Sequence, residues 1–152
     1  FIQSVEDARE VALGFHHEFS SFLYLSVASD ANPVHHWDAQ NPEGFAYAAT
    51  REERLKSVTE WASSWRADEW YADGFVSDYG RSSQENDVNT YAELLMADPG
   101  KLVELAAKWP RIDAKARILA RFYASVDPGL DARLRSGPTA AFLKEVDGES
   151  PS

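Results

Sequence analysis

The chain of 152 residues contains no cysteine, and this absence removes two kinds of chemistry. Disulfide bonds cannot form, and zinc sites built on thiolates are excluded. The compartment stays open, because a cysteine-free chain can fold in the cytosol, in the periplasm or outside the cell. The sequence also lacks an apolar run of 18 residues, so it predicts no membrane-spanning helix.

Basic side chains are scarce relative to acidic ones. Fifteen Lys and Arg stand against 25 Asp and Glu, which gives a net charge of −10. Because affinity for nucleic acid comes largely from Lys and Arg on phosphates, this balance weighs against a nucleic-acid partner and against an anionic membrane surface. Peptides and proteins remain as partners, and the sequence leaves the oligomeric state open.

What is present favours one globular domain over residues 1–152. Apolar residues make up 44% of the chain and aromatic residues 12%, enough for a core of ordinary size. The chain begins at Phe1 without a methionine, which we interpret as a processed protein or a fragment of a longer one.

Apolar residues recur at helical spacing along most of the chain, and no stretch has the alternation of a strand. Ser4 is placed to cap the first helix, and Thr50 with Glu53 forms a capping-box pattern for the second. Asp98-Pro99 stops one helix and starts the next, with Pro99 at its first position. Trp109-Pro110 is another break, where we expect a sharp change of direction between two helices packed against each other. We therefore predict an all-α fold of five or six helices. The expected helices cover residues 4–28, 50–70, 82–97, 99–109 and 112–125, with a short amphipathic segment at 139–146.

The first helix carries the most informative motif, GFHHEFSSFLYL over residues 14–25. His17 and Glu18 match the first half of H-E-x-x-H, in which two histidines one helical turn apart bind zinc. The fourth position after His17 is Ser21, whose hydroxyl is a weak zinc ligand. His17, Ser21 and Tyr24 share a helical face that differs from the apolar stripe through Phe15 and Phe19, and a metal-site face would have this placement.

Other polar groups are weaker signals. Tyr79 precedes the helical segment ENDVNTYAE (residues 85–93), which can equally be a capped helix with a solvated acidic face. His35 and His36 are adjacent in a loop, where surface or packing roles are expected. The sequence has no E-x-x-H pair for a di-iron bundle, no Gly-rich phosphate loop and no G-x-S-x-G.

The order of five motifs resembles the zinc-binding metallopeptidases of bacteria, a branch of the zincin superfamily. The resemblance covers roughly residues 11–123. It rests on HHEFSS, NPEGFAYA (41–48), FVSDYG (75–80), ENDVNTYAELL (85–95) and KWPRIDAKARILARFY (108–123). It implies an active-site helix, a third ligand (usually Glu) on a later helix, and a tyrosine seven residues before that ligand. It also suggests export from the cell.

Carried over by position, the resemblance makes His17 a zinc ligand, Glu18 the general base and Tyr79 the tyrosine that assists catalysis. Ser21 stands where the second histidine belongs, and Asn86 stands where the ligand glutamate belongs. In a shifted register, the neighbouring acids Glu85 or Asp87 could take the place of Asn86. Zincins place a β-sheet before the active-site helix, and only 16 residues precede His17 here. Either the sheet lies in a part of the protein outside this chain, or the fold has lost it.

Two of three expected protein ligands are therefore replaced, and a catalytic zinc normally keeps three. We expect weak zinc binding or none, although carboxylates could hold a harder cation such as calcium. Three functions follow as hypotheses. The chain is a metallopeptidase-like domain that binds a peptide or protein, an active metal-dependent peptidase with altered ligands, or an unrelated helical scaffold. Under the first two, the five positions His17, Glu18, Ser21, Tyr79 and Asn86 should converge in space.

Overall fold

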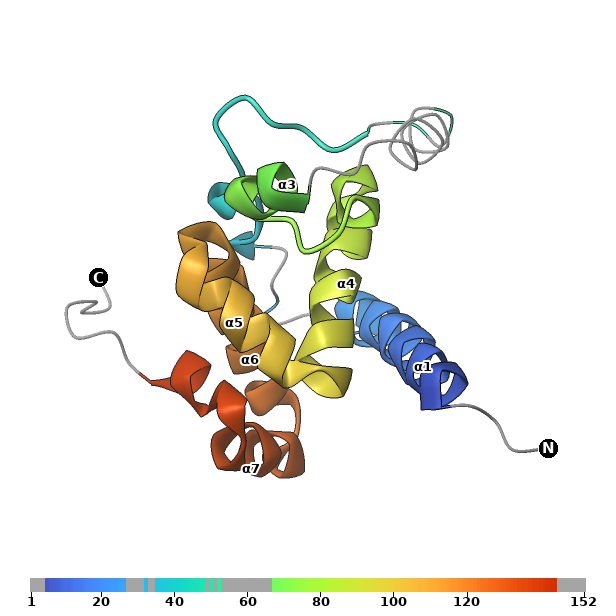
Figure 1. Cartoon of the computed structure of the whole chain (residues 1–152), viewed down its shortest axis with the longest axis vertical. Coiled ribbons are helices and arrows are strands. Elements are labelled where there is room, and N and C mark those ends of the chain that lie inside the picture. The colour runs from blue at the N-terminus through green and yellow to red at the C-terminus, as the bar shows by residue number, and fades with distance from the viewer. Residues whose placement is uncertain are drawn as a thin grey trace.

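The computed structural model describes residues 5–26, 32, 35–48, 50, 52 and 67–144 (Figure 1). Within these residues the fold is all-α and contains no strand, which confirms the predicted class. No helix in this part of the chain is long and apolar enough to cross a membrane. The α-helices are α1 (Val5–Ser26), α3 (Ala67–Asp73), α4 (Gln84–Ala97), α5 (Pro99–Lys108), α6 (Pro110–Val126) and α7 (Pro128–Ser136), and 3₁₀ turns lie at Asp38–Gln40, Tyr79–Ser82 and Pro138–Leu143.

The helix boundaries follow signals in the local sequence. Ser83 caps α4 by accepting a hydrogen bond from the backbone N–H of Asn86, and Asp98 caps α5 in the same way through Lys101. Trp109 is extended, with φ −124° and ψ 104°, and Pro110 begins α6. Because α5 and α6 pack against each other, the predicted change of direction at this dipeptide is confirmed (Figure 1).

One helix was missed. The sequence pattern predicted that the last strong helix ends at Pro128-Gly129 and that only a short segment follows it. Instead, Asp127 accepts hydrogen bonds from the backbone N–H groups of Gly129 and Leu130, and Pro128 occupies the first turn of α7. Asp-Pro starts a helix at this point for the reason it does at Asp98-Pro99, since proline loses nothing at a first helical position.

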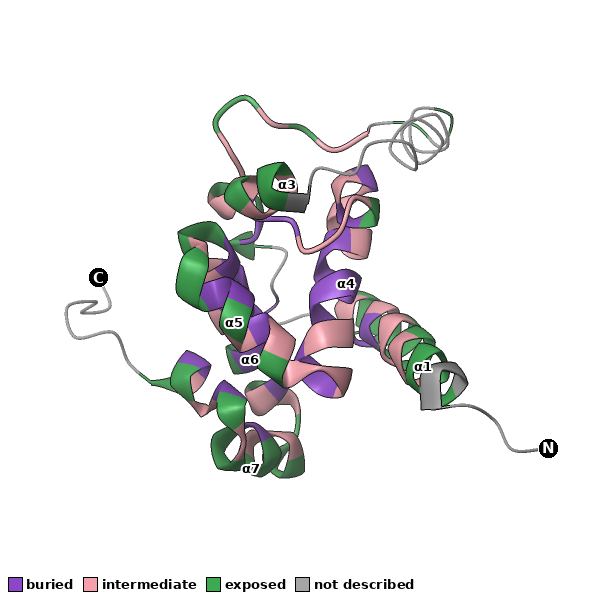
Figure 2. Cartoon of the chain, in the orientation of Figure 1, coloured by how far each residue is buried: buried purple, intermediate pink, exposed green. Residues whose placement is uncertain are grey.

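The core lies where α4, α5 and α6 meet, and α7 and the last 3₁₀ turn close it from below (Figure 2). The apolar residues that recur at helical spacing in α4 and α6 are buried. The fully or almost fully buried apolar residues of these two helices are Val88, Tyr91, Ala92, Leu95, Ile112, Ala116, Leu119, Ala120, Phe122 and Tyr123.

Some predictions fall outside the described residues. They are the Ser4 cap, the partner Glu53 of the Thr50 capping box, and most of the helix expected at 50–70 with its apolar residues Leu55, Val58, Trp61, Ala62 and Trp65. Its end is described: Gly74 adopts φ +87° directly after α3, a conformation that glycine tolerates and other residues avoid.

Helix α1 packs against α4 with a face of unusual composition. An amphipathic helix normally buries its apolar side. Among the residues of α1 whose burial is described (8–26), only Ser20 and Leu23 are buried, whereas most of the large apolar residues are exposed (Figure 2). The motif face and the apolar stripe are thus distinct, as predicted, and it is the motif face that packs against the body.

Candidate functional site

A ladder of polar side chains joins α1 to α4; we name it the polar seam. On α1 its members lie at positions 17, 21 and 24, three or four residues apart on one face. Because α1 and α4 run antiparallel, successive seam residues of α1 contact residues of α4 with decreasing numbers. The hydrogen bonds are His17 Nδ1 to Glu93 Oε1 (2.6 Å), Ser21 Oγ to Glu85 Oε1 (2.8 Å), Asn89 Nδ2 to Ser21 Oγ (2.7 Å) and Tyr24 Oη to Gln84 Oε1 (2.5 Å).

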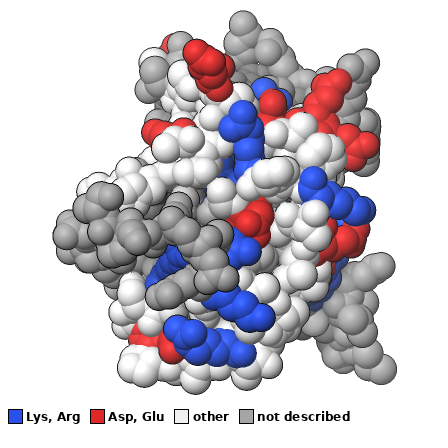
Figure 3. Space-filling model, turned by 90° about the vertical axis from the view of Figure 1, so that its left-hand side faces the viewer, with Lys and Arg blue, Asp and Glu red and all other residues white. Residues whose placement is uncertain are grey.

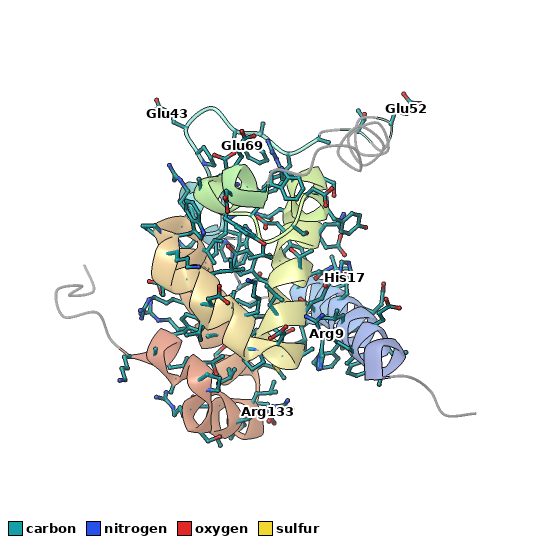
Figure 4. The ribbon with its side chains drawn as sticks, viewed as in Figure 1. Arg9, His17, Glu43, Glu52, Glu69 and Arg133 are labelled. Carbon is teal, nitrogen blue, oxygen red and sulfur yellow. The ribbon has the colours of Figure 1, made fainter. Side chains whose placement is uncertain are left out.

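His17 is the best-defined titratable group of the seam. It lies between α1 and α4 (Figure 4), and its ring centroid is 5.8 Å from that of Tyr79. The hydrogen bond to Glu93 raises the pKa of His17, although partial burial opposes this shift. The charges of Glu93, Glu18 and Glu85 add to the increase. An imidazole held by a carboxylate in this way is oriented and easily protonated.

His16, its neighbour, has the opposite character. Its Nδ1 is buried and has no hydrogen-bond partner. Burial lowers the pKa of His16, and the positive charge of Arg133 lowers it further. The pKa values of these two adjacent histidines are therefore shifted in opposite directions, because His17 faces a carboxylate whereas His16 is partly buried near the cation of Arg133.

The structure brings together only some of the residues singled out from the sequence. His17 lies next to Tyr79, and Ser21 contacts Glu85. Asn86 instead donates to Ser82 Oγ at 2.8 Å, at the start of its own helix. Glu18 is exposed and makes no hydrogen bond or ion pair with any described residue.

Asp87, the other stand-in ligand, belongs to the core and does not face α1. Its Oδ2 accepts hydrogen bonds from Lys115 Nζ, Trp37 Nε1 and Tyr47 Oη, each at 2.7 Å. Asp87 and Lys115 are fully buried. Burial raises the pKa of Asp87 and lowers that of Lys115, while their mutual attraction opposes both shifts. This cluster is a structural ion pair, and Asp87 is not free to bind a metal.

Sequence reasoning missed this buried cluster, but a signal existed. Lys115 interrupts the apolar face that Ile112, Ala116 and Leu119 form on α6. A lysine in the middle of a buried stripe requires an acidic partner. Asn89 of the seam was also missed, although it lies one helical turn after Glu85, on the same face of α4.

The donors near His17 are already engaged with one another in the polar seam. Among the described residues, no three His, Cys, Asp or Glu side chains are grouped so that they could hold a metal ion. His17 Nδ1 is engaged by Glu93, and Ser21 by Glu85 and Asn89. His35 and His36 are exposed surface residues, as expected.

The outward side of α1 is a second candidate site; we name it the α1 stripe. It consists of the large apolar residues of the helix that are exposed to solvent, namely Val11 (62% exposed), Phe15 (62%), Phe19 (36%), Phe22 (64%) and Leu25 (73%). The rings of Phe15 and Phe19 stack with centroids 6.0 Å apart. Glu18 lies on the same outward side, midway along the stripe. Apolar patches of this kind mark interaction surfaces.

The side of the molecule that carries α5 and α6 differs from the α1 stripe. Figure 3 shows its Lys and Arg side chains interspersed with Asp and Glu. Several of them form ion pairs within a helix, as do Lys108 with Glu104 and Arg117 with Asp113. Such pairs contribute to solubility and little to stability.

Comparison of the chain with protein-family models, with curated proteins and with solved structures finds no match.

Proposed function

We propose that this domain binds a peptide or protein partner through the α1 stripe, and that its metallopeptidase-like residues hold α1 on α4 instead of hydrolysing a substrate. The observation that carries the proposal is the orientation of α1. Its polar motif face packs against the body, and its apolar face is exposed to solvent. Three phenylalanines exposed on one helix do not contribute to the core of the domain, and exposed apolar residues gathered in this way are typical of a binding surface.

Stability measurements test whether the stripe is free of intramolecular packing. Phe22 is 64% exposed, so we expect Phe22→Asp to change the free energy of unfolding by no more than about 0.5 kcal/mol. A loss above roughly 2 kcal/mol would mean that the chain itself covers the stripe, because only buried phenylalanines have that effect. Urea unfolding followed by circular dichroism gives the value.

A binding selection tests the function itself. A displayed library of amphipathic helical peptides is selected on the immobilised domain, and each binder is then measured against two variants. We expect Phe22→Asp to abolish binding, and Ala107→Asp, which places the same charge at an exposed site of α5, to leave it unchanged. If no binder emerges, or if all binders ignore Phe22→Asp, the stripe is not a docking surface.

The degenerate zinc site is tested by titration calorimetry. The unaltered domain should bind zinc weakly or not at all, since it offers fewer than three good ligands around His17. Ser21→His restores the i, i+4 histidine pair, and Glu85 already contacts position 21. This single change should therefore create one-to-one zinc binding. Adding Asn86→Glu should improve it little, because the Asn86 side chain bonds to Ser82.

Two results would contradict this proposal. Tight one-to-one zinc binding by the unaltered domain would revive the altered-ligand peptidase. If neither variant gains affinity while circular dichroism shows an intact fold, the metallopeptidase register is wrong and the unrelated-scaffold hypothesis gains support.

An active hydrolase with an altered ligand set is the second candidate. The observation in its favour is the hydrogen bond between Glu93 and His17, beside Tyr79. A carboxylate that fixes one ring nitrogen of a histidine leaves the other for a proton or a metal. Cleavage of a fluorogenic peptide library, with and without added zinc, tests this candidate. Any activity should disappear in His17→Gln.

A further inference from the structure

The chemistry of the partner can be deduced from the composition of the α1 stripe, and the inference rests on the proposed function. Val11, Phe15, Phe22 and Leu25 are spaced by four, seven and three residues, and Glu18 divides the gap of seven into three and four. The five positions thus follow the 4-3-4-3 rhythm of a helix that packs along another helix. At 1.5 Å per residue, the stripe from Val11 to Leu25 is about 21 Å long.

Glu18 would be buried in any such complex. It lies in the centre of the stripe, is exposed in the free domain, and makes no hydrogen bond or ion pair with any described residue. Burying a carboxylate against apolar side chains without a counter-charge is strongly unfavourable. A partner helix therefore needs a cation at the position that meets Glu18.

The domain does not supply that cation from a second copy of α1. The only Lys or Arg between residues 5 and 26 is Arg9, and it forms an ion pair with Asp98 at 2.6 Å on the α4 side of the helix. His16 and His17 also lie on the inner side. Two stripes packed together would bring Glu18 of both copies to one interface, and the net charge of −10 adds repulsion between copies.

We propose that the α1 stripe binds an amphipathic helix of another protein, whose apolar face carries one Lys or Arg opposite Glu18. The apolar residues of that helix pack between Phe15, Phe22 and Leu25. The cation pairs with Glu18 and sets the register, as a single polar residue does within a coiled coil.

The helical peptide library provides the test when its central apolar position is fully randomised. We expect Lys and Arg to be enriched there among binders that Phe22→Asp abolishes. A selected lysine peptide and its norleucine counterpart are then titrated by fluorescence anisotropy into the unaltered domain and into Glu18→Gln. The lysine peptide should lose about tenfold or more in affinity on Glu18→Gln, and the norleucine peptide should bind the variant at least as well as the unaltered domain.

Glu10→Gln is the matched control, because it removes the same charge from an exposed position of the same helix that lies off the stripe, seven residues before His17, and it should have a smaller effect. If apolar residues are enriched at the central position, or if Glu18→Gln affects both peptides equally, the cationic partner is refuted while docking on the stripe stands. If no peptide depends on Phe22, the proposed function fails as well.

Two other occupants would overturn the inference. A dimer seen by sedimentation, and dissociated by Phe22→Asp, would assign the stripe to a second copy. Binding to zwitterionic phosphatidylcholine vesicles, lost in Phe22→Asp and accompanied by no peptide binding, would assign it to lipid.

Discussion

Removal of the buried cation at position 115 is the sharpest test of the core. Lys115 is fully buried, and its Nζ donates to Asp87 Oδ2 at 2.7 Å and to the Gly74 carbonyl at 3.0 Å. It also lies 4.1 Å from the centroid of the Phe75 ring. Lys115→Met keeps most of the volume and removes the charge. The Gly74 carbonyl still accepts a hydrogen bond from Tyr91, so the loss falls mainly on Asp87.

Breaking a buried ion pair by removing one partner costs about 3–5 kcal/mol. We expect the lower end, about 3 kcal/mol, because Trp37 and Tyr47 still donate to the Asp87 carboxylate, and because burial already raises the pKa of Asp87 and eases its protonation. For a domain of this size, that loss lowers the melting temperature by about 6–12 °C. Urea unfolding followed by tryptophan fluorescence, with circular dichroism as a second probe, measures it.

The double variant Lys115→Met with Asp87→Asn separates the lost charge from lost packing. Because it leaves no buried carboxylate without a counter-charge, the double variant should be more stable than Lys115→Met alone by about 1 kcal/mol or more. The cost of Lys115→Met should also shrink as the pH falls through the raised pKa of Asp87. A cost below about 1 kcal/mol for the single variant, or additive losses in the double variant, would refute the buried charged pair.

Two further predictions concern pH and backbone strain. The raised pKa of His17 stabilises the fold below about pH 6.5, its ordinary unfolded value, and the effect is lost as the pH rises through the folded pKa. The lowered pKa of His16 destabilises the fold as the pH falls below that same value. Between pH 8 and 5.5, thermal melts of His17→Gln should therefore lose stability relative to the unaltered domain, and those of His16→Gln should gain it; parallel curves would contradict the seam. Gly74→Ala should cost roughly 1–3 kcal/mol in urea unfolding, because φ is +87° and its Cβ would lie 2.8 Å from Arg111 Cβ. Gly100→Ala, with no atom within 4 Å of its Cβ, is the control and should lose nothing.

The sequence by itself determined the fold class and most helix boundaries. Such features are local. Ser83 and Asp98 cap the helices that follow them, and Trp109-Pro110 forces a break, whatever the rest of the chain does. The same local signal is present at Asp127-Pro128, which begins α7, but the prediction from the sequence missed this helix. Periodicity also separated the motif face of α1 from its apolar stripe.

Only the tertiary structure decided which face of α1 is buried. Periodicity gives the two faces of a helix but not the neighbour that each one meets. Glu85, Asn89 and Glu93 of α4 satisfy the polar face of α1, and this leaves the phenylalanines outside. In the same way, the ion pair of Asp87 with Lys115 spans 28 positions in the sequence and depends on how α4 and α6 are packed together. Long-range partners of this kind decide whether an acidic residue is a candidate ligand or part of the core.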